Sequence, residues 1–253
     1  MRTKNIIIEN GITTIEEKKF YGQNIGLLTL PEGLKRIEDY AFWHNYITNV
    51  IIPESVNYIG IMAFCSNSLK EIIIPKNIDT INDRLFGNNY LEKLSIPENI
   101  KIIKKQAFEL NRLKDLIIPD TVTYIGDYAF RGNFLENVII SKNMKEINEG
   151  VFSLNRLKKI IIAENITRIG ENAFQENLLT KIIIPENIKI IERGAFYKNE
   201  ILEIQIGTKV EYDNYAFGQY WQEFSEASNK NNRCGGTYWF NKGNGIWEYS
   251  MIK

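Results

Sequence analysis

The segment LEKLSIPENIKIIKKQAFELNR, residues 91–112, holds in one copy the pattern that decides the fold of this chain. Ten phenylalanines repeat the position of Phe108, at intervals of 22 residues except for a last interval of 21: Phe20, Phe42, Phe64, Phe86, Phe108, Phe130, Phe152, Phe174, Phe196 and Phe217. A fixed period of this length is typical of a solenoid, in which each unit covers the apolar face of its neighbour. Functional residues are therefore expected on a surface of the stack.

Two further columns keep the same register. All six prolines fall at one repeat position, namely Pro31, Pro53, Pro75, Pro97, Pro119 and Pro185. Eight consecutive units share an asparagine at another position: Asn45, Asn67, Asn89, Asn111, Asn133, Asn155, Asn177 and Asn199. Because stacked amides can bond neighbouring units and turn carbonyls at once, we interpret this column as structural. A weaker asparagine column after the proline suits a turn.

The local pattern of the unit predicts its secondary structure. In L-x-x-I-x-I the apolar residues alternate, which is typical of a short strand with one buried face, and the proline ends it. The A-F pair is interpreted as a bend or single helical turn that places the ring in the core. Repetition stacks the strands in parallel, about 4.8 Å apart. We expect a mainly β solenoid of ten units over residues 3–217, with a parallel sheet on one face and short strands, turns or single helical turns on the other.

Residues 218–253 break the period and are rich in large aromatic residues. The pattern predicts a short helix near residues 220–230, then strands over 236–240 and 246–249 joined by a turn that contains Gly243. Such a segment is expected to cap the open end of the solenoid, which repeat proteins need to protect. An aromatic platform for carbohydrate is the functional alternative for this tail.

The pattern L-x-x-I-x-I-P-x-x-I-x-x-I-x-x-x-A-F resembles the BspA-like leucine-rich repeats of bacterial proteins, over about residues 3–217. The resemblance implies a right-handed leucine-rich-repeat solenoid, on or outside the bacterial cell, that binds host or bacterial proteins and has no catalytic activity. The chain departs from the family pattern in three ways. It shows no export signal, so a cytoplasmic location stays open; asparagine stands where the family often has cysteine; and the unit is one residue shorter than the commoner 23.

Composition narrows the function classes. Lys and Arg balance Asp and Glu at 31 each, whereas a nucleic-acid surface would need clustered cationic residues in excess. The longest apolar runs, such as residues 72–75 and 160–163, are far shorter than the roughly 18 residues of a membrane span. Cys65 and Cys234 are expected to be free thiols. We expect a monomer that binds a protein partner and neither nucleic acid nor membrane.

Charged residues also follow the repeat. One column alternates in sign at every unit: Lys70, Glu92, Lys114, Glu136 and Lys158. Stacking would place each charge about 4.8 Å from its opposite, so we predict a ladder that favours correct register. Tyr90, Arg112, Phe134 and Arg156 form a third column, in which guanidinium and aromatic groups alternate as in a cation–π stack.

One column does not look structural. Alternation points it to solvent, yet it holds isoleucine in six units, interrupted by Ser95: Ile51, Ile73, Ile117, Ile139, Ile161 and Ile183. Six exposed isoleucines on stacked strands would form an apolar patch of roughly several hundred Å², the size that marks interaction sites. The alternative is plain β-propensity with cover from neighbouring charged stems. We predict a partner-binding face along these six residues, with Lys159 and Lys181 beside them.

Catalysis has little support in the sequence. The single histidine, His44, has no fixed Ser, Cys or acidic partner, and no metal-ligand spacing, phosphate-binding loop or nucleophile motif occurs. We therefore expect no cofactor and no enzyme. A carbohydrate-active parallel β-helix is the enzyme alternative, but it would need carboxylates and bases clustered on adjacent units. Asp115 and Lys159 lie two units apart, roughly 10 Å.

Overall fold

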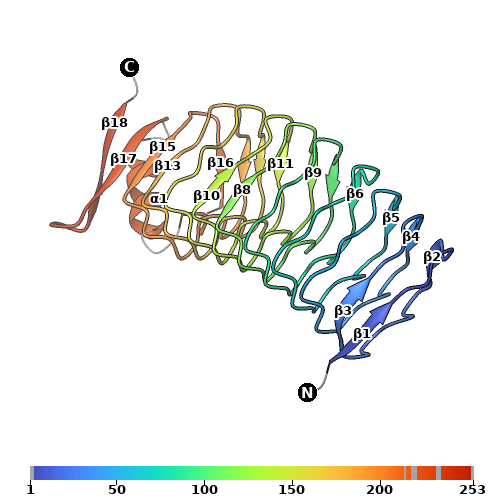
Figure 1. Ribbon diagram of the computed structural model, residues 1–253. Helices are drawn as coiled ribbons and strands as arrows, with labels where there is room; N and C mark the ends of the chain where they lie inside the picture. The colour runs from blue at the N-terminus through green and yellow to red at the C-terminus, as the bar shows by residue number, and fades with distance from the viewer. Residues whose placement is uncertain (1–2, 214, 218–220, 232–234, 252–253) are drawn as a thin grey trace.

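The computed structural model describes residues 3–213, 215–217, 221–231 and 235–251. They form an elongated, curved stack of rungs, one rung for each repeat unit, with the N-terminal rung at one end and a helix and hairpin at the other (Figure 1). Residues 22 positions apart lie side by side on neighbouring rungs, as the pairing of Ile117 with Ile139 shows. The predicted solenoid of parallel strands is confirmed.

The segments before each proline form one long surface, which we call the strand face. Its strands are β1 (Lys4–Ile7), β3 (Ile25–Thr29), β8 (Asp115–Ile117), β10 (Asn137–Ile139), β13 (Lys181–Ile183) and β15 (Glu203–Ile206). They pair in parallel as β1 with β3, β8 with β10 and β13 with β15. Residues 50–52, 71–74, 93–96 and 159–162 keep the same pattern but are not in regular strands.

The sheet on the strand face is thus interrupted, whereas the sequence predicted one running the whole length. Rung spacing is maintained instead at the turns, where three backbone N–H groups of each rung from Phe20 to Phe174 reach the next one. In the rung of Phe108 the donors are Gln106, Phe108 and Leu110, with N···O distances of 2.8–2.9 Å. Because water can bond the exposed backbone groups of the strand face, gaps in its ladder cost little.

A second set of short parallel strands runs along the opposite side of the rungs. They are β2 (Thr14–Ile15), β4 (Arg36–Ile37), β5 (Tyr58–Ile59), β6 (Thr80–Ile81), β7 (Ile102–Ile103), β9 (Tyr124–Ile125), β11 (Glu146–Ile147), β12 (Arg168–Ile169), β14 (Ile190–Ile191) and β16 (Glu211–Tyr212). They make sheets of three, three and four strands. The sequence predicted short strands, turns or single helical turns on this side, and the structure has short strands there, each of two residues.

The phenylalanine rings stack through the middle of the molecule. Neighbouring rings from Phe20 to Phe217 lie 5.3–6.1 Å apart between centroids and within 19° of parallel. The eight rings from Phe42 to Phe196 are fully buried. Each such pair contributes about 0.5–1.5 kcal/mol beyond the burial of its area. The prediction that the A-F turn places its ring in the core is confirmed.

Two positions of each turn from the one of Phe20 to the one of Phe196 have left-handed backbone, which the sequence did not indicate. They flank the A-F pair, as Gln106 (φ 56°) and Leu110 (φ 55°) flank Ala107 and Phe108. Glycine fills these two columns in only four places: Gly22, Gly132, Gly150 and Gly194. The other members have side chains, at a cost of roughly 1–2 kcal/mol each. The inter-rung hydrogen bonds and the buried rings hold them there.

The asparagine column is structural, as predicted. The side-chain Nδ2 of Asn111 donates to the carbonyl oxygens of Phe86 and Phe108, at 2.9 and 3.2 Å, while its Oδ1 accepts the backbone N–H of Leu91 at 2.9 Å. The same pattern recurs from Asn45 to Asn199, and all eight side chains are buried. In the second column, the Asn77 amide donates to the Glu54 carbonyl, which confirms its role in the turn.

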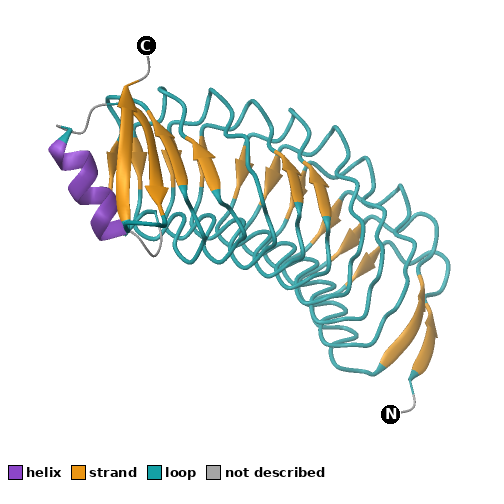
Figure 2. Ribbon diagram, turned by 90° about the vertical axis from the view of Figure 1, so that its left-hand side faces the viewer, coloured by secondary structure: helices purple, strands orange, loops and turns teal. Residues whose placement is uncertain are grey.

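The C-terminal segment contains α1 (Trp221–Lys230) and the hairpin of β17 (Gly236–Asn241) and β18 (Ile246–Met251), which confirms the predicted elements (Figure 2). Strand β17 pairs antiparallel with β15, the last strand of the strand face. Phe224 of α1 packs its ring against Phe217, Tyr238 and Trp247, at 5.0–5.3 Å between centroids. Helix and hairpin therefore cover the apolar edge of the last rung.

Replacing Asn111 with Leu should lower the free energy of unfolding by about 1–3 kcal/mol, because the carbonyls of Phe86 and Phe108 and the N–H of Leu91 lose their partner in the core. Urea denaturation followed by circular dichroism measures the change. Lys114→Leu, on an exposed side chain three residues away, is the control and should change stability little. Equal stability of Asn111→Leu and the wild type would contradict the structural role.

Replacing Leu110 with Gly should leave the melting temperature unchanged or raise it, because glycine has no Cβ to strain the left-handed backbone. The matched control is Leu27→Gly, on a similarly exposed leucine in β3, which should cost about 0.5–1 kcal/mol. Thermal unfolding of both variants tests the difference. An equal loss at the two positions would show that the turn imposes no strain.

We propose that residues 218–253 form the cap of a solenoid made by residues 3–217. Deleting them should expose Ile204, Ile206 and the free edge of β15, so the truncated chain should self-associate. Size-exclusion chromatography with light scattering measures this. A milder variant, Phe224→Ala, should destabilise the whole chain by about 3–5 kcal/mol. A truncated chain that remains a monomer with native stability would identify the tail as an independent module.

Candidate partner-binding face

The six isoleucines predicted to point outward do so. Ile51, Ile73, Ile117, Ile139, Ile161 and Ile183 are 47–80% exposed. Their sequence neighbours point inward; Leu116 and Ile118, on either side of Ile117, are buried. Strand alternation places the column on the surface, and the 22-residue register places its members one rung apart, except across the rung of Ser95.

The apolar surface extends further than the sequence analysis recognised. Ile7, which pairs with Thr29, occupies the same column on the first rung and is 76% exposed. Leu27, two positions before Thr29, is also exposed on the strand face. The signal was present, because Ile7 lies two 22-residue steps before Ile51; the intervening Thr29 obscured it.

The two predicted lysines lie beside the isoleucine column in different environments. Both side chains are exposed, two residues before Ile161 and Ile183 respectively. Lys181 makes an ion pair with Glu203 on the next rung, with Nζ 2.7 Å from Oε1. Lys159 has no carboxylate within 4 Å in the part of the chain that the structure describes. Lys159 therefore offers an unpaired positive charge at the C-terminal half of the strand face.

The predicted charge ladder does not form. Among the described residues, no ion pair joins any two members of the column Lys70, Glu92, Lys114, Glu136 and Lys158. These segments are linked through their backbones; the N–H of Glu92 donates to the Lys70 carbonyl at 3.0 Å. An exposed ion pair contributes only about 0–1 kcal/mol, too little to hold two long side chains in one geometry.

The predicted cation–π contacts do form, although in pairs and not as a continuous stack. The guanidinium of Arg112 lies 4.3 Å from the ring centroid of Tyr90, and that of Arg156 lies 4.3 Å from Phe134. On the other edge of the strand face, the side chain of Lys142 bonds Asp120 at 2.6 Å and lowers the pKa of that carboxyl group. These contacts pair side chains along the two edges of the strand face with one another, so these groups contribute to the fold.

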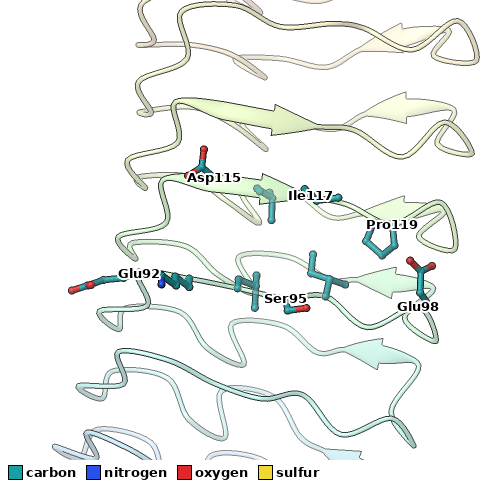
Figure 3. A pocket seen from close by; sticks show the side chains of 10 residues that line it. Glu92, Ser95, Glu98, Asp115, Ile117 and Pro119 are labelled. Carbon is teal, nitrogen blue, oxygen red and sulfur yellow. The ribbon is translucent and has the colours of Figure 1, made fainter.

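The isoleucine column is interrupted at Ser95, where the surface is hollowed. One hollow of about 490 Å³ lies between the rungs of Ser95 and Ile117, and another of about 660 Å³ lies between those of Ile73 and Ser95. Figure 3 shows Glu92 and Asp115 at one end of the first hollow and Glu98 with Pro119 at the other. The notch exists because serine is much smaller than the isoleucines on either side.

The described residues show little that resembles a catalytic or metal centre. Within them, no three His, Cys, Asp or Glu side chains come close enough to hold a metal ion. His44 is exposed at a left-handed turn position. Cys65 is a buried free thiol whose pKa is raised by that burial, which makes it a poor nucleophile, and Cys234 lies outside the described residues. No helix in the described ranges is long and apolar enough to span a membrane.

Three aromatic residues of the tail pack in the core, whereas Trp239 is exposed and its Nε1 donates to the Glu248 carboxylate at 2.9 Å. Phe224, Tyr238 and Trp247 are buried against one another and against the last rung. Their faces are therefore not available to stack on a sugar ring, as the alternative of a carbohydrate platform would require. Tyr220, a further aromatic residue of this tail, lies outside the described residues.

Comparison with known proteins identifies the family. A family model described as a BspA type leucine-rich repeat region matches residues 2–114 and 101–220, with six copies of its repeat. The match spans most of the sequence. The chain therefore belongs to the BspA-type leucine-rich repeat family, as its repeat pattern indicated.

Solved structures agree on the fold. A leucine-rich cell surface protein from Faecalibacterium prausnitzii A2-165 shares 24% identity at a TM-score of 0.54, over 83% of this chain and 62% of that one. A leucine-rich repeat protein from Bacteroides ovatus ATCC 8483 shares 22% identity at a TM-score of 0.54, over 81% of this chain and 55% of that one. The pneumococcal vaccine antigen PcpA shares 18% identity at a TM-score of 0.55, over 84% of this chain and 71% of that one. The chain thus spans somewhat over half the length of the first two. No curated protein matches it.

Proposed function

We propose that this chain is a non-catalytic scaffold that binds a protein partner on its strand face, through Ile51, Ile73, Ile117, Ile139, Ile161 and Ile183 with Lys159 and Lys181 beside them. The observation that supports this most strongly is the exposure of the isoleucine column. An isolated apolar side chain on a surface needs no explanation. A row of six at one repeat position, broken only at Ser95, forms an apolar surface of the kind found at interaction sites.

The form of the face favours a protein as the partner. It is long and open, and its charged rims surround an apolar centre, as in a protein–protein interface. Net charge is zero, so the electrostatic attraction that a nucleic acid would need is missing. The F. prausnitzii relative is described as a cell surface protein, where partners on other cells or in the medium are accessible.

Ile117, Ile139 and Ile161 lie at the centre of the strand face, and changing all three to Thr should preserve the fold while removing apolar contact area. We expect the affinity for the partner to fall at least ~10-fold, which corresponds to about 1.4 kcal/mol. The partner is first captured with the wild-type chain from bacterial and host extracts, purified, and then titrated against each variant by calorimetry.

The matched control changes two exposed isoleucines outside the strand face, Ile12→Thr and Ile190→Thr, and should bind like the wild type. Circular dichroism checks that both variants keep the fold. Wild-type affinity of the triple variant would show that the isoleucine column is not the binding face. Loss of the fold in the triple variant would show that these side chains belong to the core.

A further inference from the structure

We propose that the notch at Ser95 receives a bulky apolar side chain of the protein partner, and that this side chain is flanked by basic residues in the partner. This inference rests on the proposed function, since it concerns the same face, and it states what kind of segment binds there. Three features of the described residues support it: the shape of the gap, the apolar walls and the distribution of charge around it.

The gap has the shape of a hole for one large side chain. Ile73 and Ile117 stand two rungs apart, roughly 10 Å, with only the short side chain of Ser95 between them. The hollows on both sides of Ser95 share this residue and Glu98, and their volumes fall in the range of roughly 300–1,000 Å³ typical of ligand sites. A flat partner surface resting on the isoleucines would leave this space unfilled and lose contacts there.

The walls of the gap are apolar. The exposed side chain of Ile117 stands on one side and that of Ile73 on the other, above the buried side chains of Leu116 and Ile72. A side chain that inserts between them buries its surface against aliphatic carbon on both sides, which is the arrangement of an anchor residue in an interface. A leucine, phenylalanine or tryptophan of the partner fits this chemistry.

Negative charge predominates at both ends of the gap. Glu92 and Asp115 lie at one end and Glu98 at the other (Figure 3). None of these three exposed carboxylates has a Lys or Arg nitrogen within 4 Å in the described ranges; Asp115 accepts a hydrogen bond from the Asn137 amide at 2.8 Å. Lys93 also lines this hollow, and Glu54 and Lys76 line the second one. Carboxylates thus outnumber ammonium groups by four to two.

Charge favours such a segment at Ser95 over the C-terminal half of the strand face. Near Ile161, the exposed residues Lys158 and Lys159 would repel a basic segment, and near Ile183 the carboxylate of Glu203 is already paired with Lys181. Complementary charges set the register of a complex more than they raise its affinity. A partner with an apolar anchor between basic residues therefore binds in one register, with its anchor in the Ser95 gap.

The experiment uses a random peptide library displayed on phage and selected in parallel on the immobilised full chain and its variants. On the wild type, we expect enrichment of peptides with one large apolar residue between Arg or Lys residues. Ser95→Ile fills the gap and should weaken binding of a synthetic selected peptide at least ~10-fold in a fluorescence-polarisation titration. Thr29→Ile adds the same side chain to the same column far from the gap and should leave binding unchanged.

Charge is tested separately with the same peptide. The variant Glu92→Gln with Glu98→Gln should weaken binding several-fold, and the loss should shrink when the peptide's arginines are replaced by citrulline, its neutral analogue. The control, Glu136→Gln with Glu186→Gln, changes the equivalent columns away from the gap and should bind like the wild type.

The outcomes separate this inference from the proposed function. Peptides that bind Ser95→Ile as tightly as the wild type, but are lost on the triple threonine variant of Ile117, Ile139 and Ile161, overturn the Ser95 site and leave the binding face standing. Peptides that bind both variants like the wild type overturn both. Selected peptides with an apolar anchor but no enriched basic residues overturn the assigned charge of the partner.

Discussion

The side-chain amide of Asn111 holds three backbone segments at once, the N–H of Leu91 and the carbonyls of Phe86 and Phe108. Two of these belong to the preceding rung and one to its own turn, so the amide fixes both the shape of the turn and its position on its neighbour. In the core, where water cannot replace a lost bond, each amide strongly penalises a shifted register. Eight such bridges make the stack one unit.

Because the register is constant, residues at one repeat position form a column along the stack, and a functional surface of this fold is built from such columns. A residue at an outward strand position lies beside its counterpart on the next rung, so an isoleucine at this position in most units gives a row of isoleucines on the strand face. A single departure has the opposite effect, and Ser95 produces a local hollow because both neighbours are larger. The proposed specificity of this protein lies in such a departure from the repeat and not in the repeat itself.

Not every regular column of residues in the sequence makes side-chain contacts between neighbouring rungs. The alternating charges from Lys70 to Lys158 show no ion pair, whereas the amides and rings of the core make the same contact in every rung. Burial explains the difference. A buried amide without a partner costs about 1–3 kcal/mol, but an exposed charge is already solvated and gains about 0–1 kcal/mol from a partner. Periodicity alone does not distinguish the two cases.

The sequence by itself determined the 22-residue unit, the solenoid, the stacked rings, the asparagine column and the outward isoleucines, because each follows from a pattern repeated many times. It also indicated the helix and hairpin of the tail, through the break in the period. The tertiary structure alone decided the left-handed turn positions, since residues such as Gln106 and Leu110 do not signal them, and the interruptions of the sheet on the strand face. It also decided the hollow at Ser95, which depends on side chains of adjacent rungs that are distant along the chain.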